Sequence, residues 1–474
     1  MERKTILLLF TLLFALIVSS CVPTTFLPPT DIHITTGDQV EQAVVAVDGN
    51  GRSHIAGVVA DRIVYYRTRY GEADPLGKFT MVMSGSGTNW KQYDPDIAVL
   101  NNGTAYIVWV EQHGGPEKYA CWRNVPLVPP VGGYEKTCLP LDSTIQTTGN
   151  VQVASNGYSV YAVYDRKYLT DGMGRIDSLR YKELTNTANT GYAYYYIDYF
   201  ETGFIHGLDM VIDNADKLHI AIVDNFTYTG SPPYTDRLLY RSNRTAQADG
   251  TMTQGMTVAT GTSLGEDVDP SISIYTDSVD GPRIGIASIW VISGKDYIYI
   301  DSCTVDGCEY IGAHLVDLPS SWDTFSVIDD LEIQGRDEYL FLGFIGDDNT
   351  APTGAPQVYF TEAFDTTIFY DPSDGSASFK FDLEMNMIDP RAGSGATAPI
   401  PVLSWAENDL VSATYYAEGW LSEVVRVSED GCPESQMSGD VGSNGIYLSG
   451  VWYACSDTWF TTQAWTEQLP LIVK

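Results

Sequence analysis

Carboxylate side chains stand at two kinds of position in this sequence: just before short runs of apolar residues, and just after them. Carboxylate oxygens are natural Ca²⁺ ligands, and a facing pair of carboxylates is the machinery of most glycosidases. A single Asp or Asn more often bonds to its own backbone and shapes a turn or a strand end. These three roles compete for the candidates, which are Asp94, Asp96, Asp267, Asp269 and Asp389 before apolar runs, and Glu111, Asp165, Asp224 and Glu407 after them.

Other catalytic signatures are absent from the sequence. It contains no His-Glu-x-x-His zinc motif, no Gly-x-Ser-x-Gly elbow, no phosphate-binding loop and no dinucleotide fingerprint. Of the six scattered histidines, His54 and His219 occupy equivalent places in two similar segments, where packing explains them. We therefore assign no catalytic residue and no cofactor, apart from the Ca²⁺ that the carboxylates could bind.

Charge and composition narrow the function classes further. The 474 residues include 61 acidic and 27 basic ones, a formal net charge of −34, which excludes a nucleic-acid binder and favours cationic partners. The 44% hydrophobic content is ample for a core. The 31 Tyr, 10 Trp and 16 Phe, with 43 Gly and 23 Pro, fit short aromatic strands joined by tight turns.

The N-terminal segment predicts export. Arg3 and Lys4 precede an apolar run from Ile6 to Val18, which is shorter than the roughly 20 residues of a membrane span. The run ends in Val18-Ser19-Ser20-Cys21, which resembles the lipobox of bacterial lipoproteins. That resemblance implies a signal peptide over 1–20, acylation of Cys21 (for example by palmitate), a tether over 21–30, and a place on the extracytoplasmic face of a bacterial membrane. The alternative is an ordinary signal peptide whose cleavage site happens to hold a cysteine.

The cysteine count agrees with a lipid site at Cys21. Removing that residue from the seven cysteines leaves six, which fall into three couples that are close in the sequence. Six cysteines allow 15 connectivities, so local pairing is a hypothesis. An Asp-Gly hairpin signal inside the second couple supports it. We expect structural disulfides in the couples Cys121 with Cys138, Cys303 with Cys308, and Cys432 with Cys455.

A repeat of strand, turn, strand, loop and strand runs through residues 31–474. The clearest copy runs from Asp94 to Trp109 and continues in a third strand at Tyr119–Arg123. Eight copies have an average period of about 56 residues, which is typical of four-stranded propeller blades. We predict one all-β domain over 31–474, a single β-propeller of eight antiparallel blades, or seven if the loose last copy is not a full blade. The second strands end at Val58, Trp109, Tyr164, Val223, Trp290, Phe344, Trp405 and Trp452.

The two ends of the chain are expected to close the ring. Asp31–Gly37 resembles Leu141–Gly149, which stands where a fourth strand should precede a new blade, so it is a candidate outer strand of the last blade. The rival for that strand is Leu469–Val473. In a propeller the carboxylates named above share one face with the long loops. Arg391, at the start of an inner strand, is the one arginine that we expect near the central channel.

The units resemble the blades of secreted bacterial propellers in the sialidase-like, BNR-repeat superfamily. Asp-Pro pairs at Asp94, Asp269 and Asp389, the Gly turns and the Trp-ended second strands carry this resemblance. The superfamily's Asp-box survives only as a trace at Ser84–Trp90 that lacks the Asp. We find no arginine triad such as a sialidase requires, so the resemblance implies a fold rather than a reaction.

The function that these features favour is a lipid-anchored extracytoplasmic binding module. We expect a monomer that presents its acidic face to a protein or a glycan. The alternative is a carbohydrate-active enzyme, a sialidase-like glycoside hydrolase or lyase, that uses loop carboxylates.

Overall fold

The computed structural model describes residues 30–31, 40–69, 80–81, 90–114, 118–126, 136–138, 145–146, 151–169, 175–186, 195–196, 204–226, 235–245, 252, 257–261, 270–292, 295–305, 314–315, 327–347, 357–363, 380–388, 399–407, 410–417, 420–421, 425–427, 434–441, 447–454 and 457–464. Strands dominate this part of the chain, which contains one short 3-10 helix, η1 (Asn243–Thr245). None of its helices has the length and apolar character needed to cross a membrane.

The described strands form eight antiparallel sheets, which we number by the chain order of their innermost strands. Sheet 1 contains β2 (Glu41–Val47), β3 (Arg52–Val59), β4 (Arg62–Arg69) and β5 (Thr80–Met81). Sheet 2 contains β6 (Trp90–Val99), β7 (Ala105–His113), β8 (Lys118–Val125) and β9 (Thr137–Cys138). Sheet 3 contains β10 (Ile145–Gln146), β11 (Val151–Ser155), β12 (Val160–Leu169), β13 (Arg175–Glu183) and β14 (Tyr195–Tyr196). Sheet 4 contains β15 (Phe204–Ile212), β16 (Leu218–Phe226), β17 (Thr235–Ser242) and β18 (Thr257–Gly261).

The second half of the chain repeats this pattern. Sheet 5 contains β19 (Ser271–Asp277), β20 (Gly281–Ile292), β21 (Lys295–Thr304) and β22 (His314–Leu315). Sheet 6 contains β23 (Val327–Arg336), β24 (Tyr339–Asp347) and β25 (Gln357–Glu362). Sheet 7 contains β26 (Lys380–Ile388), β27 (Ile400–Glu407), β28 (Leu410–Ala417), β29 (Trp420–Leu421) and β30 (Val425–Arg426). Sheet 8 contains β31 (Glu434–Val441), β32 (Tyr447–Ala454), β33 (Asp457–Ala464) and β1 (Thr30–Asp31).

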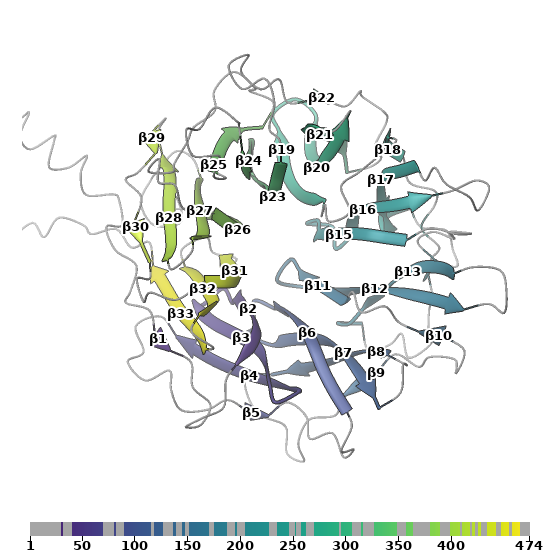
Figure 1. Cartoon of the computed structure of the whole chain (residues 1–474), viewed down its shortest axis with the longest axis vertical. Helices are drawn as coiled ribbons and strands as arrows, with labels where there is room; N and C mark the ends of the chain where they lie inside the picture. The colour runs from purple at the N-terminus through teal and green to yellow at the C-terminus, as the bar shows by residue number, and fades with distance from the viewer. Residues whose placement is uncertain are drawn as a thin grey trace, which may run out of the picture.

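The sheets stand around a common centre, with β2, β6, β11, β15, β19, β23, β26 and β31 innermost (Figure 1). In each repeat the next strands of the chain pair outward from this inner strand. This arrangement is a β-propeller, so the predicted fold class is confirmed. The short strands β5 and β14 are the outermost strands of sheets 1 and 3.

The two ends of the chain share sheet 8, as predicted. Thr30 pairs with Phe460 and Asp31 with Trp459, so β1 is the outer strand beside β33. The rival segment 469–473 and the rest of the predicted closing strand, residues 32–37, lie outside the described residues. The comparison with Leu141–Gly149 was wrong in one respect. Within that segment, β10 pairs with β12 of sheet 3, whereas the outer strand of sheet 2 is β9.

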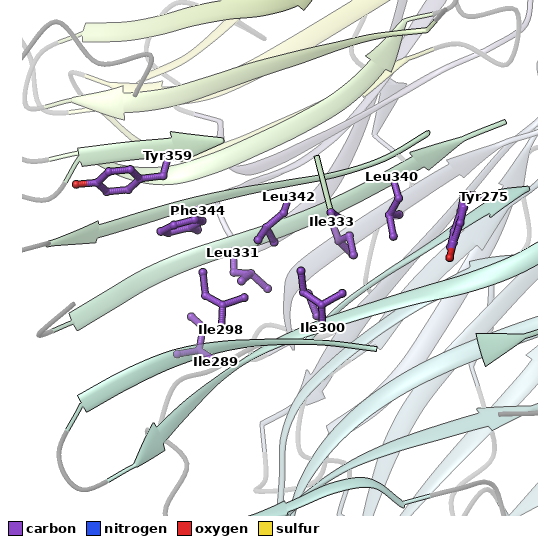
Figure 2. Close-up of a cluster of buried hydrophobic side chains, with 12 residues drawn as sticks. Tyr275, Ile289, Ile298, Ile300, Leu331, Ile333, Leu340, Leu342, Phe344 and Tyr359 are labelled. Carbon is purple, nitrogen blue, oxygen red and sulfur yellow. The ribbon is translucent and has the colours of Figure 1, made fainter. Parts of the chain in front are cut away.

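Apolar side chains fill the spaces between neighbouring sheets. Figure 2 shows the cluster between sheets 5 and 6, where Ile298 and Ile300 face Leu331 and Leu342. Close approach of these sheets depends on Gly285, because a Cβ atom there would lie 2.7 Å from Leu340 Cδ2. Trp109 and Trp405 were predicted to end second strands, but β7 continues to His113 and β27 to Glu407. Both tryptophans are fully buried in the equivalent clusters of other sheets.

Buried histidines in sheets 1 and 4 form matching networks. His54 Nδ1 lies 2.7 Å from the Tyr65 hydroxyl, and His219 Nδ1 lies 2.5 Å from the Tyr240 hydroxyl. The opposite ring nitrogen of His219 faces Asp213 Oδ2 at 3.3 Å. Because both histidines are fully buried and serve the same role in two sheets, their function is structural, as the sequence predicted.

Candidate functional site

A cavity of about 630 Å³ occupies the centre of the ring. Its lining comes from the inner strands of six sheets, β11, β15, β19, β23, β26 and β31, with Pro270 immediately before β19. The volume falls within the range of small-ligand sites, roughly 300–1,000 Å³. The charged side chains of the lining are Asp209, Asp330, Glu332, Glu384, Asp440 and Arg336.

Two of these carboxylates, Asp209 and Asp330, each join one inner strand to the next. An inner strand is a sheet edge. The N–H groups on its open side, toward the centre of the ring, therefore have no partner in their own sheet. Asp209 Oδ2 accepts a hydrogen bond from the amide of Ile272 at 2.8 Å, and Asp330 Oδ2 accepts one from Leu383 at 2.6 Å. In both residues Oδ1 accepts the amide of the next residue in the chain. We call these inter-sheet carboxylates the staples.

Two more staples continue the series around the ring. Asp96 Oδ2 accepts the amide of Val153 at 2.7 Å, and Asp440 Oδ2 accepts the amide of Val47 at 2.6 Å. Asp96 was predicted as a ligand-face residue, but both of its carboxylate oxygens accept backbone amides. The staples thus join sheet 2 to 3, 4 to 5, 6 to 7 and 8 to 1.

Uncharged side chains make similar links at other junctions. Ser271 and Ser273 of sheet 5 accept the amides of Ile333 and Gly335 of sheet 6, at 3.0 and 2.8 Å. The strands approach so closely here that a Cβ atom on Gly335 would lie 2.6 Å from the carbonyl oxygen of Ile274. Between sheets 3 and 4, Gln152 Nε2 donates to the Leu208 carbonyl at 2.8 Å.

Burial of the staples changes their titration. Burial raises the pKa of Asp96 to about 6 and that of Asp440 to about 7, although the backbone hydrogen bonds that both accept act in the opposite direction. A carboxylate without nearby positive charge resists ionisation when it is removed from water. The negative charge of Asp96 and Asp440 therefore depends on pH near neutrality.

Glu332 and Glu384 differ from the staples. The only hydrogen bond of the Glu332 carboxylate among the described residues comes from Ser271 Oγ, at a long 3.5 Å. Burial raises its pKa well above the ordinary value, and the charges of Glu384, Asp209 and Asp330 raise it further. Glu332 is thus a carboxyl group that faces a cavity with most of its bonding capacity unused.

Asp94 lies at the edge of the ring, between sheets 1 and 2. Its amide donates to Gln42 Oε1 at 3.0 Å, and Gln42 Nε2 donates back to Asp94 Oδ1 at 3.3 Å. Both residues have positive φ, 48° and 50°, at bulges of their inner strands. The bulges shift the strands so that the next polar side chains, such as Asp96, meet the neighbouring sheet.

Glu111 occupies a separate, buried network in sheet 2. Its Oε1 accepts hydrogen bonds from Lys136 Nζ and His113 Nε2, both at 2.5 Å, and its Oε2 accepts one from Gln92 at 2.8 Å. Burial raises the pKa of Glu111, but these donors outweigh burial and the pKa is lowered. The His113 ring stacks on Trp90 with centroids 3.9 Å apart. With both oxygens occupied, Glu111 acts in the structure as an ion-pair partner.

A disulfide joins Cys121 of β8 to Cys138 of β9, as the local pairing predicts. Its sulfurs lie within 4.8 Å of a Glu111 oxygen, but a disulfide does not provide the thiolates that a metal such as zinc requires. Cys303 also forms a disulfide, whereas Cys308, Cys432 and Cys455 lie outside the described residues, and so does Cys21.

The remaining predicted candidates lie in second strands, one place out from the inner ring, or outside the described residues. Asp165 belongs to β12, Asp224 to β16 and Glu407 to β27. Asp267, Asp269, Asp389 and Arg391 lie outside the described residues. The cavity carboxylates were missed because we searched the ends of strands. Alternation of polar and apolar residues inside the inner strands, as in Asp330-Leu331-Glu332-Ile333, is the signal that points to them.

Comparisons with known proteins find distant structural matches. No family model and no curated protein matches the sequence. Oligopeptidase B from Leishmania major matches with a TM-score of 0.45 at 8% identity, and the match covers 90% of this chain and 54% of that chain. The chain therefore spans about half the length of that peptidase.

Two propeller glycosidases match at a similar level. The Trypanosoma rangeli sialidase in complex with sialic acid has 10% identity and a TM-score of 0.36, with 91% of this chain and 59% of that chain covered. The Penicillium chrysogenum α-L-arabinanase complexed with arabinobiose has 7% identity and a TM-score of 0.40, with 79% and 93% covered. The chain is of the β-propeller class, which its own ring of antiparallel sheets defines.

Proposed function

We propose that this protein is a lipid-anchored extracytoplasmic binding module that takes a cationic segment of a protein partner into its central cavity. The observation that carries the proposal is the charge of the cavity, whose lining contains five carboxylates and one guanidinium group. The formal net charge of −34 adds a long-range attraction toward cations.

The side chains of the cavity suit a cationic guest. The carboxylate oxygens of the staples already accept backbone amides. The staples therefore supply negative potential without being available as strong ligands. Glu332 and Glu384 come from neighbouring inner strands and provide the carboxylates that would contact the guest. A cation next to a buried carboxyl group favours ionisation of that group. A bound cation would therefore stabilise the ionised form of Glu332.

Attachment to a membrane rests on the N-terminal sequence. The lipobox-like run ends at Cys21, and the first described strand begins at Thr30, which leaves a tether of up to about 30 Å when extended. Cys21→Ser should release the protein from membranes without changing its fold. Unchanged membrane partitioning in detergent-free fractionation would contradict the anchor.

The binding proposal is tested by titrating the full-length protein, in detergent micelles, with an acetylated and amidated trilysine peptide. Calorimetry should detect binding that the double variant Glu332→Gln/Glu384→Gln weakens at least tenfold. The matched control is Asp280→Asn, which removes one exposed carboxylate from the β19–β20 turn. EDTA in all samples removes Ca²⁺, which would compete for the same oxygens. Equal affinity of the double variant and the wild type would overturn the proposal.

A second candidate, a carbohydrate-active enzyme, is favoured by one observation. The raised pKa of Glu332 beside Glu384 is what a general acid and a neighbouring carboxylate require in glycoside hydrolysis. A panel of glycans incubated with the wild type tests it. Turnover that is lost in both Glu332→Gln and Glu384→Gln would replace the binding module by an enzyme.

A further inference from the structure

The charges of the cavity are unevenly distributed along the ring axis. Hydrogen bonding of the Leu383 amide to Asp330 places these two residues at the same depth. Glu332 is two residues further along β23, and Glu384 is one residue beyond Leu383 on β26. The two glutamates therefore lie within about one residue rise, ~3 Å, of each other along the axis.

The positive charge lies at the C-terminal ends of the inner strands. Arg336 is the last residue of β23, and its Nη1 approaches the Met387 carbonyl of β26 at 3.5 Å. Four residues separate Arg336 from Glu332, which corresponds to about 13 Å along an extended strand. The cavity thus has a negative middle and a positive end.

Uncharged polar groups lie between these two ends. The lining includes the carboxamides of Gln334 and Asn386, each of which offers both donors and an acceptor. Such groups suit the backbone N–H and C=O groups of an extended peptide. A simple cation or a polyamine would gain nothing from the guanidinium of Arg336.

From this polarity we infer that the ligand is the C-terminal tail of a protein, with its free carboxylate at Arg336 and a Lys or Arg side chain at Glu332 and Glu384. This inference rests on the proposed function and specifies its partner. An extended peptide rises about 3.3 Å per residue, so the basic residue stands three or four positions before the last one. Arginine suits the terminal carboxylate because its guanidinium can bind both oxygens at once.

The test compares two peptides on the full-length protein in detergent micelles. They are Ac-Lys-Gly-Gly-Gly with a free C-terminal carboxylate and the same peptide with a C-terminal amide. The wild type should bind the free acid at least tenfold more tightly than the amide. Ac-Gly-Gly-Gly-Lys, which has the same charges at the wrong spacing, should bind at least fivefold more weakly than Ac-Lys-Gly-Gly-Gly.

Variants of the protein test the contributions of the two ends of the ligand separately. Arg336→Gln should reduce the preference for the free acid to about onefold by weakening binding of the free acid, and Arg336→Lys should retain part of the preference. Glu332→Gln should weaken both peptides. Circular dichroism and the melting temperature check that each variant is folded, and the acid–amide comparison in the wild type does not depend on any variant.

The outcomes distinguish the inference from the proposed function. Equal binding of acid and amide by the wild type, or equal binding of the two Lys positions, overturns the C-terminal tail but leaves a cation-binding module. Absence of binding by every lysine peptide overturns the proposed function itself.

Discussion

Asp440 of β31 accepts the amide of Val47 of β2 at 2.6 Å, and this bond joins the last sheet of the ring to the first. The two residues are 393 positions apart in the sequence. The same geometry joins Asp96 to Val153, Asp209 to Ile272 and Asp330 to Leu383. A propeller has an exposed edge on every inner strand, and these carboxylates satisfy edge amides that would otherwise face the cavity.

Removing a staple should destabilise the ring. Asp440→Ala leaves the amide of Val47 without its acceptor, and an unsatisfied buried group costs about 1–3 kcal/mol. Urea denaturation near neutral pH measures this loss. Asp280→Ala, which removes only a surface ion pair with Arg283, should cost under about 1 kcal/mol. Equal losses in the two variants would show that the inter-sheet bond contributes nothing specific.

The stability should fall as the pH rises toward neutrality. The pKa values of Asp96 and Asp440 are raised from 3.8 to about 6 and about 7 by burial. Between these values the folded state holds protons that the unfolded state has released, so the free energy of unfolding decreases with increasing pH. Urea denaturation at about pH 5 and about pH 8 should show the difference, and Asp440→Asn should reduce it. A flat profile would argue against the raised pKa values of Asp96 and Asp440.

Binding of a cationic peptide should release a proton. Burial and neighbouring carboxylates raise the pKa of Glu332, so the protonated form must ionise before it can pair with a cation. Affinity should therefore increase with pH, and calorimetry in two buffers of different ionisation enthalpy should detect the released proton. Glu332→Gln should abolish this buffer dependence. A dependence that persists in the variant would assign the proton to another group.

Loss of Asp213 should disrupt the buried network of sheet 4. Burial raises the pKa of Asp213, but the His219 ring 3.3 Å away and hydrogen bonds from the amides of Lys217 and Ala215 outweigh burial, so the pKa is strongly lowered. Its contribution to stability is present above the unfolded pKa, 3.8, and disappears as the pH falls below it. Asp213→Ala should cost about 3–5 kcal/mol at neutral pH, measured by urea denaturation. A cost that stays the same at about pH 3 would contradict this electrostatic origin.

The Cys121–Cys138 disulfide should hold the outer strand of sheet 2. It closes a loop with a sequence separation of 17 residues, for which the chain-entropy estimate is about 3 kcal/mol. Cys121→Ala/Cys138→Ala should lose about this amount and speed hydrogen exchange in β9, next to Lys136. Exchange that slows or stays constant would mean that strand pairing alone holds β9.

The sequence alone determined the class of fold and its repeat, because strand patterns and turn residues are local signals. Trp109 and Trp405 were recognised as large residues of second strands, and both are buried between sheets. The pairing of Cys121 with Cys138 was also visible, since the two cysteines flank neighbouring strands. The sharing of one sheet by both chain ends followed from the need to close a ring.

Only the tertiary structure decided which carboxylates gather at the centre. An Asp on an inner strand can meet water, a ligand or the amide of the next sheet. The outcome depends on how far along the ring axis the Asp lies relative to the neighbouring sheet, and no local sequence pattern encodes this position. Asp96 and Glu332 illustrate this, because both stand at alternating positions of inner strands. Asp96 accepts two backbone amides, whereas Glu332 receives one long hydrogen bond and faces the cavity.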